Sequence, residues 1–253
     1  MKAALVAAER GHKVTLYEKG DSLGGLFRHT DFTTYKWTWK EFKDCLIRQV
    51  NKAGIEVQLK TIATPEMIKA KVYDTVLVAV GAEPVISKIP GAEGKNIYNI
   101  VDVYSNIRSL GKNVVLIGGG VFGSETGVYL VMEGYKVTAL TSEKYMIPPE
   151  VIGPHNKANQ LNVIERDPNF SYILEATAKS ISGGKVTYVD SKGNEKSVQG
   201  DSIVIYAGLK PKQDEAMKFS GSAGQVLLLG DCTGENGNLQ KAIRSAFFVA
   251  SQV

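Results

Sequence analysis

Three glycines near the middle of the chain have the spacing of a phosphate-binding turn. Gly118, Gly120 and Gly123 form the pattern G-x-G-x-x-G directly after the apolar run 114–117. Gly118 permits the tight turn, Gly120 lets a pyrophosphate approach the backbone, and Gly123 lets the following helix pack closely against the strand. The amino end of that helix offers free N–H groups and a partial positive charge to phosphates. The pattern therefore predicts a dinucleotide site, with a purely structural glycine turn as the alternative.

The residue that ends the next strand, expected over 136–140, decides which dinucleotide fits. An acidic residue at this position binds the ribose 2′-hydroxyl of NAD. This chain has Thr141 there, followed by Ser142, Glu143 and Lys144. The hydroxyl of Thr141 can bond either a ribose hydroxyl or a phosphate, and Lys144 is either a ligand of a 2′-phosphate or a solvated surface charge. The choice between NAD and NADP stays open.

The chain repeats itself. Residues 11–18 match 134–141, and residues 74–84 match 201–211, in the same order and at nearly the same separation. A repeat this long indicates a duplicated domain rather than a solenoid. Each copy alternates apolar strand patterns with helical patterns, among them a helix expected over 124–133. Alternating strands and helices predict an α/β fold with a parallel sheet and helices on its faces.

Two further helices have recognisable amino ends. Thr38 and Glu41 have the spacing of a capping box, in which each side chain bonds a backbone N–H group, and apolar residues follow at helical spacing. Asp102 is expected to cap a second helix that ends at Gly111. The segment 148–159 has the composition of a loop.

The first copy of the repeat departs from the second at its amino end. Its strand ends in Glu18, the residue type that binds an adenosine ribose. With the spacing of the second copy, the last glycine of its phosphate loop falls one position before Met1, so residues 1–10 correspond to the helix that follows such a loop. We therefore expect the first strand and its phosphate loop to lie outside this chain.

Together these motifs resemble a known family. The marks are Glu18 followed by Gly24 and Gly25, the segment 80–84, the glycine motif with Glu125, and Asp231 after a glycine near the carboxyl end. The chain resembles the C-terminal, FAD- and NAD(P)-binding half of the NADH:flavin oxidoreductases of the 2,4-dienoyl-CoA reductase and trimethylamine dehydrogenase type. The resemblance implies two Rossmann-like three-layer dinucleotide-binding domains, the second inserted in the first.

That topology assigns residues to the two domains. An N-terminally truncated FAD-binding domain is expected over 1–108 and 209–253, and an inserted NAD(P)-binding domain over 109–208. The resemblance implies that a hydride passes from NAD(P)H to FAD, so that the chain is a flavin-dependent NAD(P)H oxidoreductase module. This transfer needs no protein acid or base, and no catalytic residue is assigned. The alternative is a truncated, non-catalytic nucleotide-binding fragment or subunit that needs a partner chain.

The resemblance also implies roles for residues of the FAD-binding domain. Glu18 would bind the adenosine ribose of FAD, and Asp231 would hydrogen-bond its ribitol or pyrophosphate end. Gly24 and Gly25 would let their loop pass close to FAD, and Gly81 would lie where FAD meets the domain boundary. Each residue has a plainer alternative: a solvated acid at a strand end for Glu18, a helix cap for Asp231, and turns or strand ends for the glycines.

Two features concern the nicotinamide and the rest of the family enzyme. Glu125 would lie near the nicotinamide, with a first-turn acid favoured by the helix dipole as the alternative. Full-length members of the family carry an amino-terminal FMN-binding barrel and an iron–sulfur cluster site, and neither is found in this sequence. A barrel domain or subunit is therefore a candidate partner besides NAD(P)H itself.

Composition excludes several other classes. The net charge is +4 and is spread along the chain, which disfavours nucleic acid as a partner. The two cysteines, Cys45 and Cys232, form no CxxC pair or Cys/His cluster, so no metal site is expected, and their number suits a reducing cytoplasm. No apolar run approaches the roughly 18 residues that a membrane helix needs.

Overall fold

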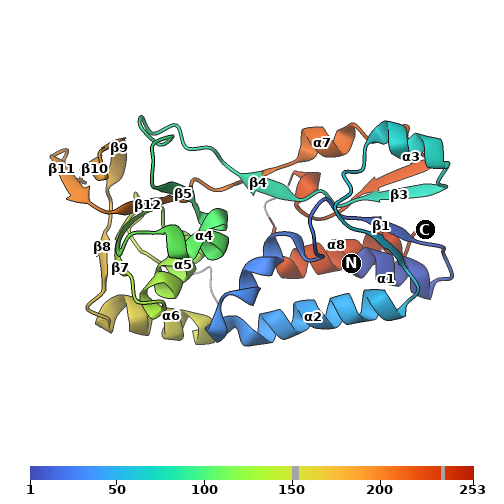
Figure 1. Ribbon diagram of the computed structural model, residues 1–253, viewed down its shortest axis with the longest axis horizontal. Helices are drawn as coiled ribbons and strands as arrows, with labels where there is room; N and C mark the ends of the chain where they lie inside the picture. The colour runs from blue at the N-terminus through green and yellow to red at the C-terminus, as the bar shows by residue number, and fades with distance from the viewer. Residues whose placement is uncertain (150–153, 235–236) are drawn as a thin grey trace. The chain divides into compact units, whose positions relative to one another are not determined.

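The computed structural model describes residues 1–149, 154–234 and 237–253, and the chain divides into two compact units (Figure 1). Unit 1 comprises Met1–Glu83 and Leu209–Val253, and unit 2 comprises Pro84–Gly208. The units divide after Glu83 and after Gly208, compared with domain boundaries expected after residues 108 and 208. The first division comes earlier because the segment before 108 contains strand β5 (Ile97–Asn99), which pairs with a strand of unit 2.

Unit 2 is built on one continuous parallel sheet of five strands, in the order β5-β12-β6-β7-β8. The other four strands are β6 (Asn113–Ile117), β7 (Lys136–Leu140), β8 (Phe170–Ile173) and β12 (Ser202–Ile205). Four of the five residues of β6 and all of β12 are buried, as expected for central strands covered on both faces. The helices of the unit are α4 (Ile100–Asn106), α5 (Gly120–Met132) and α6 (Pro154–Arg166).

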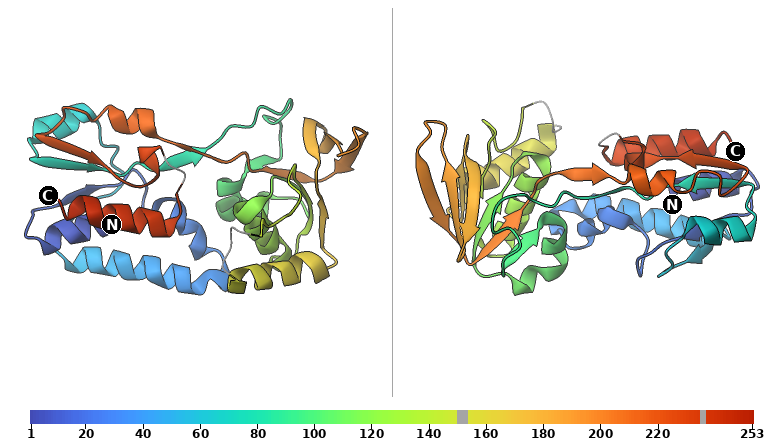
Figure 2. Two further views of the ribbon diagram at one scale, coloured as in Figure 1. Left: turned by 180° about the vertical axis from the view of Figure 1, so that it is seen from behind. Right: turned by 90° about the horizontal axis from the view of Figure 1, so that it is seen from above.

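A second, antiparallel sheet completes unit 2 as a third layer (Figure 2). Its strands are β9 (Thr177–Ser182), β10 (Lys185–Val189) and β11 (Glu195–Gln199), in the order β11-β10-β9. Ile181 and Val186 of this sheet pack with Val115 of β6 and Ile203 of β12 in one core cluster. The opposite face of β6 lies against α5, where Leu116 comes close to Gly127.

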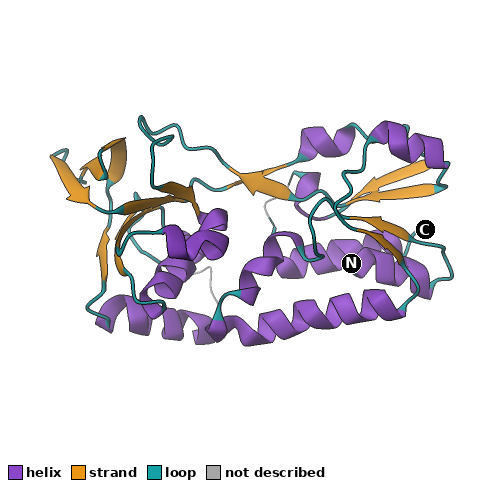
Figure 3. Ribbon diagram, in the orientation of Figure 1, coloured by secondary structure: helices purple, strands orange, loops and turns teal. Residues whose placement is uncertain are grey.

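Unit 1 contains two separate parallel strand pairs instead of one sheet (Figure 3). β1 (Thr15–Tyr17) pairs with β2 (Glu56–Gln58), and β3 (Thr75–Val78) pairs with β14 (Gln225–Leu228). The helices of the unit are α1 (Lys2–Glu9), α2 (Trp37–Lys52), α3 (Pro65–Lys71), α7 (Gln213–Met217) and α8 (Leu239–Ala250). α1 packs against α8 through small side chains that include Ala3, Ala246 and Ala250.

The connections and short turns complete the chain. The connecting strands β4 (Ala82–Pro84) and β13 (Leu209–Pro211) form a two-stranded sheet where the chain passes between the units. The 3-10 turns of the described residues span Gly25–Asp31, Thr34–Lys36, Ile107–Ser109 and Gly230–Thr233. Within the described ranges, no helix has both the length and the apolar character to cross a membrane.

Three local predictions are wrong. α2 begins at Trp37 after Lys36, which provides no side-chain cap, so Thr38 lies inside the helix instead of capping it. Asn99 caps α4 by accepting from the backbone N–H groups of Val101 and Asp102, so Asp102 is a first-turn acid. The expected loop 148–159 includes the start of α6, and residues 150–153 of that segment lie outside the described residues.

Candidate nucleotide-binding sites

The glycine loop between β6 and α5 has no room for a side chain where the backbone turns, but it has free space at the position where a phosphate must approach. Gly118 has φ +116°, and a Cβ atom there would collide with the carbonyl oxygen of Tyr206. A Cβ atom on Gly123 would lie 2.6 Å from the carbonyl oxygen of Gly118. Gly120 has φ +71°, and a Cβ atom there would meet nothing within 4 Å. The open space above Gly120 is the room that a pyrophosphate needs, so the loop fits a dinucleotide.

The amino end of α5 supplies hydrogen-bond donors to this space. The helix begins at Gly120, and the residue before it provides no side-chain cap. The N–H group of Gly120 donates to the carbonyl of Met146 at 3.0 Å, and Ser124 Oγ donates to the same carbonyl at 2.8 Å. The next N–H groups, of Val121 and Phe122, have no intrahelical acceptor in the first turn of a helix. They can therefore bind an anion together with the positive end of the helix dipole.

The sheet topology places this loop at a switch point. From β6 the chain passes through α5 to β7 on one side, while β12 lies on the other side of β6. The N–H group of Gly118 donates to Leu140 at the end of β7 at 2.8 Å, and that of Tyr206 donates to Ile117 at the end of β6 at 2.8 Å. Ligands of open α/β sheets bind outside the carboxyl ends of the strands at such a point.

Thr141 lies beside the loop but does not face solvent. Its side chain is only 3% exposed, and its hydroxyl accepts from the N–H group of Glu143 at 3.2 Å. A Cβ atom on Gly119 would lie 2.7 Å from that hydroxyl. Thr141 therefore shapes the turn against the glycine loop. The exposed residues after it, Ser142 to Lys144, are the ones that can reach a ribose or its phosphate.

Glu125 lies on α5 and has a partner that the sequence did not reveal. Gln160 of α6 is 5% exposed, and its Nε2 donates to Glu125 Oε1 at 3.4 Å. Gln160 Oε1 is buried without a hydrogen-bond partner among the described residues. A buried amide oxygen of this kind is costly unless it is paired, so Gln160 makes a polar position beside Glu125 between α5 and α6.

In unit 1, Glu18 directly follows β1, as the sequence places it. Its Oε1 accepts from the N–H group of Gly20 at 2.7 Å, so the carboxylate closes a tight turn. Gly24 and Gly25 follow with φ +124° and +54°, which L side chains rarely adopt. A Cβ atom on Gly24 would lie 3.1 Å from the side chain of Lys43, so this loop passes closely over α2.

The other two FAD candidates also follow strands of unit 1. Gly81 has φ +73° after β3, and its carbonyl accepts from the N–H group of Lys212 at 3.0 Å. Asp231 follows β14 in the turn Gly230–Thr233, and burial raises the pKa of its carboxyl group while a hydrogen bond from the N–H of Gly237 opposes that rise. Glu18, Gly81 and Asp231 thus come after the carboxyl ends of three strands, the usual ligand edge of a parallel sheet.

Cys232 is a core residue. Its side chain is fully buried, and its thiol donates to the carbonyls of Leu229 at 3.2 Å and Val78 at 3.4 Å. A free thiol buried in this way packs as a small apolar side chain. Cys45 and Cys232 are both free thiols.

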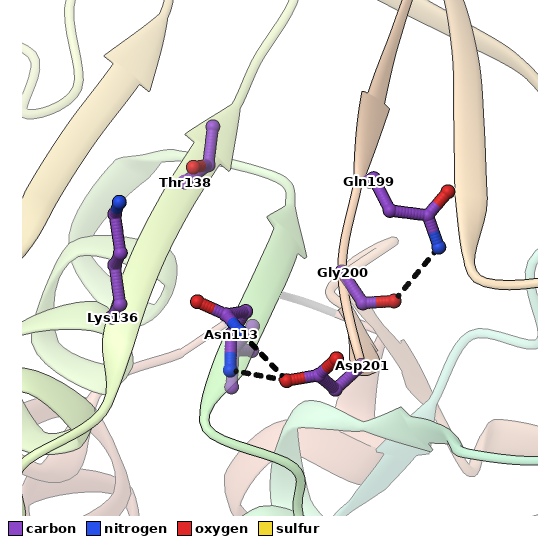
Figure 4. A pocket seen from close by; sticks show the side chains of 7 residues that line it. Asn113, Lys136, Thr138, Gln199, Gly200 and Asp201 are labelled. Atoms are coloured by element: carbon purple, nitrogen blue, oxygen red, sulfur yellow. Dashed lines mark hydrogen bonds between the residues drawn. The ribbon is translucent and has the colours of Figure 1, made fainter.

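A small hollow lies at the opposite end of the unit 2 sheet from the glycine loop (Figure 4). It has a volume of about 180 Å³ and is lined in part by Lys136, Thr138 and Gln199. The carboxylate of Asp201 accepts from the backbone N–H and the side-chain amide of Asn113 at 2.9 and 2.8 Å, and these bonds lower its pKa. The carboxylate of Asp201 is therefore already bonded to Asn113. This contact joins the start of β12 to the start of β6, and we interpret the residues around the hollow as structural.

The chain matches a family model described as pyridine nucleotide-disulphide oxidoreductase over residues 1–246. It is 33% identical over 259 residues to an NADH oxidase of Thermoanaerobacter brockii, covering 100% of this chain and 39% of that protein. It is 31% identical over 269 residues to a cinnamate reductase of Clostridium sporogenes, covering 100% of this chain and 37% of the relative. The chain therefore spans about two fifths of the length of these relatives.

Solved structures agree with this match. A 2-naphthoyl-CoA reductase in complex with 2-naphthoyl-CoA superposes with a TM-score of 0.91 at 28% identity, over 100% of this chain and 38% of that one. A thioredoxin reductase of Lactococcus lactis superposes with a TM-score of 0.76 at 17% identity, over 99% of this chain and 93% of that one. The second likeness shows the fold: an α/β, Rossmann-like dinucleotide-binding architecture.

Proposed function

Because the chain belongs to the pyridine nucleotide-disulphide oxidoreductase family, we propose that unit 2 binds NADH or NADPH and that unit 1 forms part of an FAD site. A hydride would pass from the nicotinamide to the flavin. The observation that carries the proposal is the open space above Gly120 at the uncapped amino end of α5. Open space alone is also found at turn glycines such as Gly193, so the proposal rests on its combination with the uncapped amino end of a helix that directly follows a buried parallel strand.

The residues of unit 2 would bind and orient the nicotinamide dinucleotide. The N–H groups of Val121 and Phe122 would hold the pyrophosphate, and the exposed residues after Thr141 would meet the adenosine ribose. The pair Glu125–Gln160 would offer polar atoms to the carboxamide of the nicotinamide. These groups supply position and electrostatics, and the protein donates no proton in the transfer.

The residues of unit 1 would bind FAD mainly at its adenosine ribose and its ribitol chain. Glu18 would accept from the ribose hydroxyls with its carboxylate, and Asp231 would bond the ribitol or the pyrophosphate end. Gly24, Gly25 and Gly81 would let the backbone pass close to the cofactor. When bound, the flavin supplies a two-electron acceptor that can also pass electrons on singly.

The place of this module in a larger enzyme is the finer part of the proposal. The relatives named NADH oxidase and cinnamate reductase are both more than twice as long as the segment they share with this chain. We propose that the chain acts as the reductase half of an enzyme of the NADH:flavin oxidoreductase type. An FMN- and iron–sulfur-containing barrel domain or subunit would then carry the electrons from the flavin to the final acceptor.

A titration of NADH against two glycine variants tests the proposal. Gly120→Val places a branched side chain in the open space, and we expect the affinity for NADH to fall at least about tenfold because the pyrophosphate can no longer reach the backbone. Gly193→Val is the matched control, because Gly193 also has a positive φ, +81°, and open space around it, in the turn between β10 and β11. Equal affinity in wild type and Gly120→Val would show that this loop is not the site.

One observation favours the second candidate function, a nucleotide-binding fragment or subunit that needs a partner chain. The strands of unit 1 form two separate pairs, so its part of the FAD site is less complete than the site in unit 2. The flavin absorbance of the purified chain separates the candidates. A protein that purifies yellow, with a flavin band, supports the reductase, and a colourless protein that stays inactive with added FAD supports the fragment.

A further inference from the structure

Two aromatic side chains form a pair at the mouth of the glycine loop. Phe122 lies in the first turn of α5 and is 41% exposed, although its side chain is large and apolar. Its ring contacts the ring of Tyr206, which follows β12, with 5.5 Å between the ring centroids. Burial raises the pKa of Tyr206, so its hydroxyl stays protonated at neutral pH. The pair is therefore an uncharged aromatic surface that remains partly open to solvent.

The pair is fixed to the loop by backbone contacts. The N–H group of Tyr206 donates to Ile117 at 2.8 Å, and the carbonyl of Tyr206 fills the position that a side chain on Gly118 would occupy. Phe122 also lies in the first turn of α5, where N–H groups have no intrahelical acceptor. A ligand held by the amino end of α5 therefore lies beside both rings.

The order of the strands determines which half of a dinucleotide lies on that side. The adenosine ribose of the ligand is bound at the end of the strand that follows the helix, here β7, and the pyrophosphate at the amino end of α5. β12 lies on the other side of β6 from β7. The half of the dinucleotide beyond the pyrophosphate must then extend toward the end of β12, where Tyr206 lies.

We propose that Phe122 and Tyr206 form the contact surface for the nicotinamide ring of NADH or NADPH. This inference rests on the proposed function of unit 2 and adds the residues that select the ligand at its nicotinamide end. A flat heterocycle packs well against an aromatic side chain, and stacking of a base on such a ring contributes measurably to affinity in other sites. The pair would thus favour dinucleotides that carry a planar ring over ligands that end at the second ribose.

The test compares NADH with ADP-ribose, which has the same adenosine and pyrophosphate but no nicotinamide. In the full chain, we expect Phe122→Leu and Tyr206→Leu each to lower the affinity for NADH about five- to tenfold and to leave the affinity for ADP-ribose within about twofold. Tyr172→Leu is the matched control, because Tyr172 is a similarly exposed aromatic residue of the same unit, 44% against 41% for Phe122, but lies on β8. It should change neither affinity.

Variants that keep an aromatic ring at each position show whether a loss of affinity comes from the missing ring or from misfolding. Phe122→Tyr and Tyr206→Phe should bind NADH like the wild type, because the aromatic surface remains. An equal loss of NADH and ADP-ribose in the leucine variants, or no loss of either, would overturn the inference while the site itself stands. If the wild-type chain binds ADP-ribose but not NADH, the inference also fails. If it binds neither, the proposed function of unit 2 fails.

Discussion

The two units carry the same sequence repeat, yet only one of them has a continuous sheet. In unit 2 the order is β5-β12-β6-β7-β8, and in unit 1 the pairs β14-β3 and β1-β2 correspond to the two flanks of that order. The position of β6, the strand that leads into the glycine loop, has no counterpart among the described residues of unit 1. In unit 2 the phosphate loop directly follows β6, and the described residues of unit 1 contain the flanking strand pairs but no such strand and loop.

The backbone directions support this correspondence. In unit 2, the carbonyl of Leu140 on β7 accepts from Gly118, and Tyr206 after β12 donates to Ile117, so these residues face β6. In unit 1, Glu18 donates to Gln58, so the adjacent Tyr17, the counterpart of Leu140, points away from β2. The N–H and C=O groups of alternate residues in a strand point to opposite sides. The backbone groups of Tyr17 therefore point to the side away from β2, where a counterpart of β6 would pair.

The largest expected effect comes from filling that position. Fusing a copy of residues 113–123 directly ahead of Met1 restores the spacing of the second repeat, because Gly123 corresponds to the position before Met1. We expect the affinity for FAD to rise at least about 100-fold, since charged phosphates would gain several hydrogen bonds of roughly 1.5–3 kcal/mol each. Bound flavin, measured by absorbance after gel filtration, gives the answer.

The control for this fusion carries valine at the positions copied from Gly118 and Gly120. It supplies the strand without an open phosphate loop, so it should restore the sheet but not the FAD affinity. Tight, stoichiometric FAD in the chain without any fusion would contradict the prediction. Another segment or a partner chain would then have to occupy the strand position.

A smaller effect is expected from the helix that packs on the central strand. A Cβ atom on Gly127 of α5 would lie 2.7 Å from the ring of Phe170, whereas the corresponding residue of α1 is Ala4. We expect Gly127→Ala to destabilise unit 2 by about 1–3 kcal/mol, the usual cost of overpacking, although alanine favours a helix. Denaturant unfolding measures the loss, and Phe170→Leu in the same chain should recover most of it. An increase in stability would show that α5 does not pack as closely as the distances indicate.

A side-chain contact between the strand pairs of unit 1 has no counterpart in unit 2, where β6 fills the corresponding position. The hydroxyls of Tyr17 on β1 and Tyr73, which precedes β3, form a hydrogen bond of 2.7 Å. We expect Tyr17→Phe to lower the free energy of unfolding by about 1 kcal/mol at neutral pH. The hydrogen bond to Tyr73, followed by burial, raises the pKa of Tyr17 to about 12.

The pH dependence of that contact has a definite sign. A tyrosine ionises near pH 10 in the unfolded chain, so the stabilisation is complete below pH 10 and is lost as the pH rises toward 12. The wild-type chain should lose stability in this window more steeply than Tyr17→Phe. Parallel alkaline profiles for the two proteins would show that the hydrogen bond does not form in solution.

The smallest effect is expected from an ion-pair group on α2, beneath the loop that carries Gly24 and Gly25. Lys43 is almost fully buried and pairs with Asp31 at 2.8 Å and Asp44 at 2.6 Å. Hydrogen bonds from Lys40 and Lys43 lower the pKa of Asp44 to about 2. Asp44→Asn should cost no more than about 1 kcal/mol at pH 7, because the buried Lys43 keeps its ion pair with Asp31 and the other partner, Lys40, is exposed. Because the pKa is depressed in the folded chain, the difference from wild type should disappear as the pH falls from 4 to 2, which acid titration by circular dichroism measures.

Local patterns predicted the central elements of unit 2 well. The strand–glycine–helix segment is formed by neighbours in sequence, so β6, α5 and β7 lie where the spacing places them. The cap of α2 was predicted wrongly because the chain enters this helix from a 3-10 turn, which no short motif records. The contacts of Gln160 with Glu125 and of Tyr206 with Gly118 could not be predicted, because α6 and β12 bring these residues to α5 and the loop from far along the sequence. The burial of Thr141 could not be predicted either, since it depends on the close approach of Gly119.

Backbone amide exchange tests the comparison between the units most directly. Leu140 and Val204 face β6 in unit 2, and their counterparts by the repeat are Tyr17 and Leu77 in unit 1. We predict that the amides of Leu140 and Val204 exchange slowly in the native chain, while those of Tyr17 and Leu77 exchange at least about 100-fold faster because no strand accepts their hydrogen bonds. Equally slow exchange at Tyr17 and Leu77 would contradict the account, because it would mean that the central strand position of unit 1 is already filled.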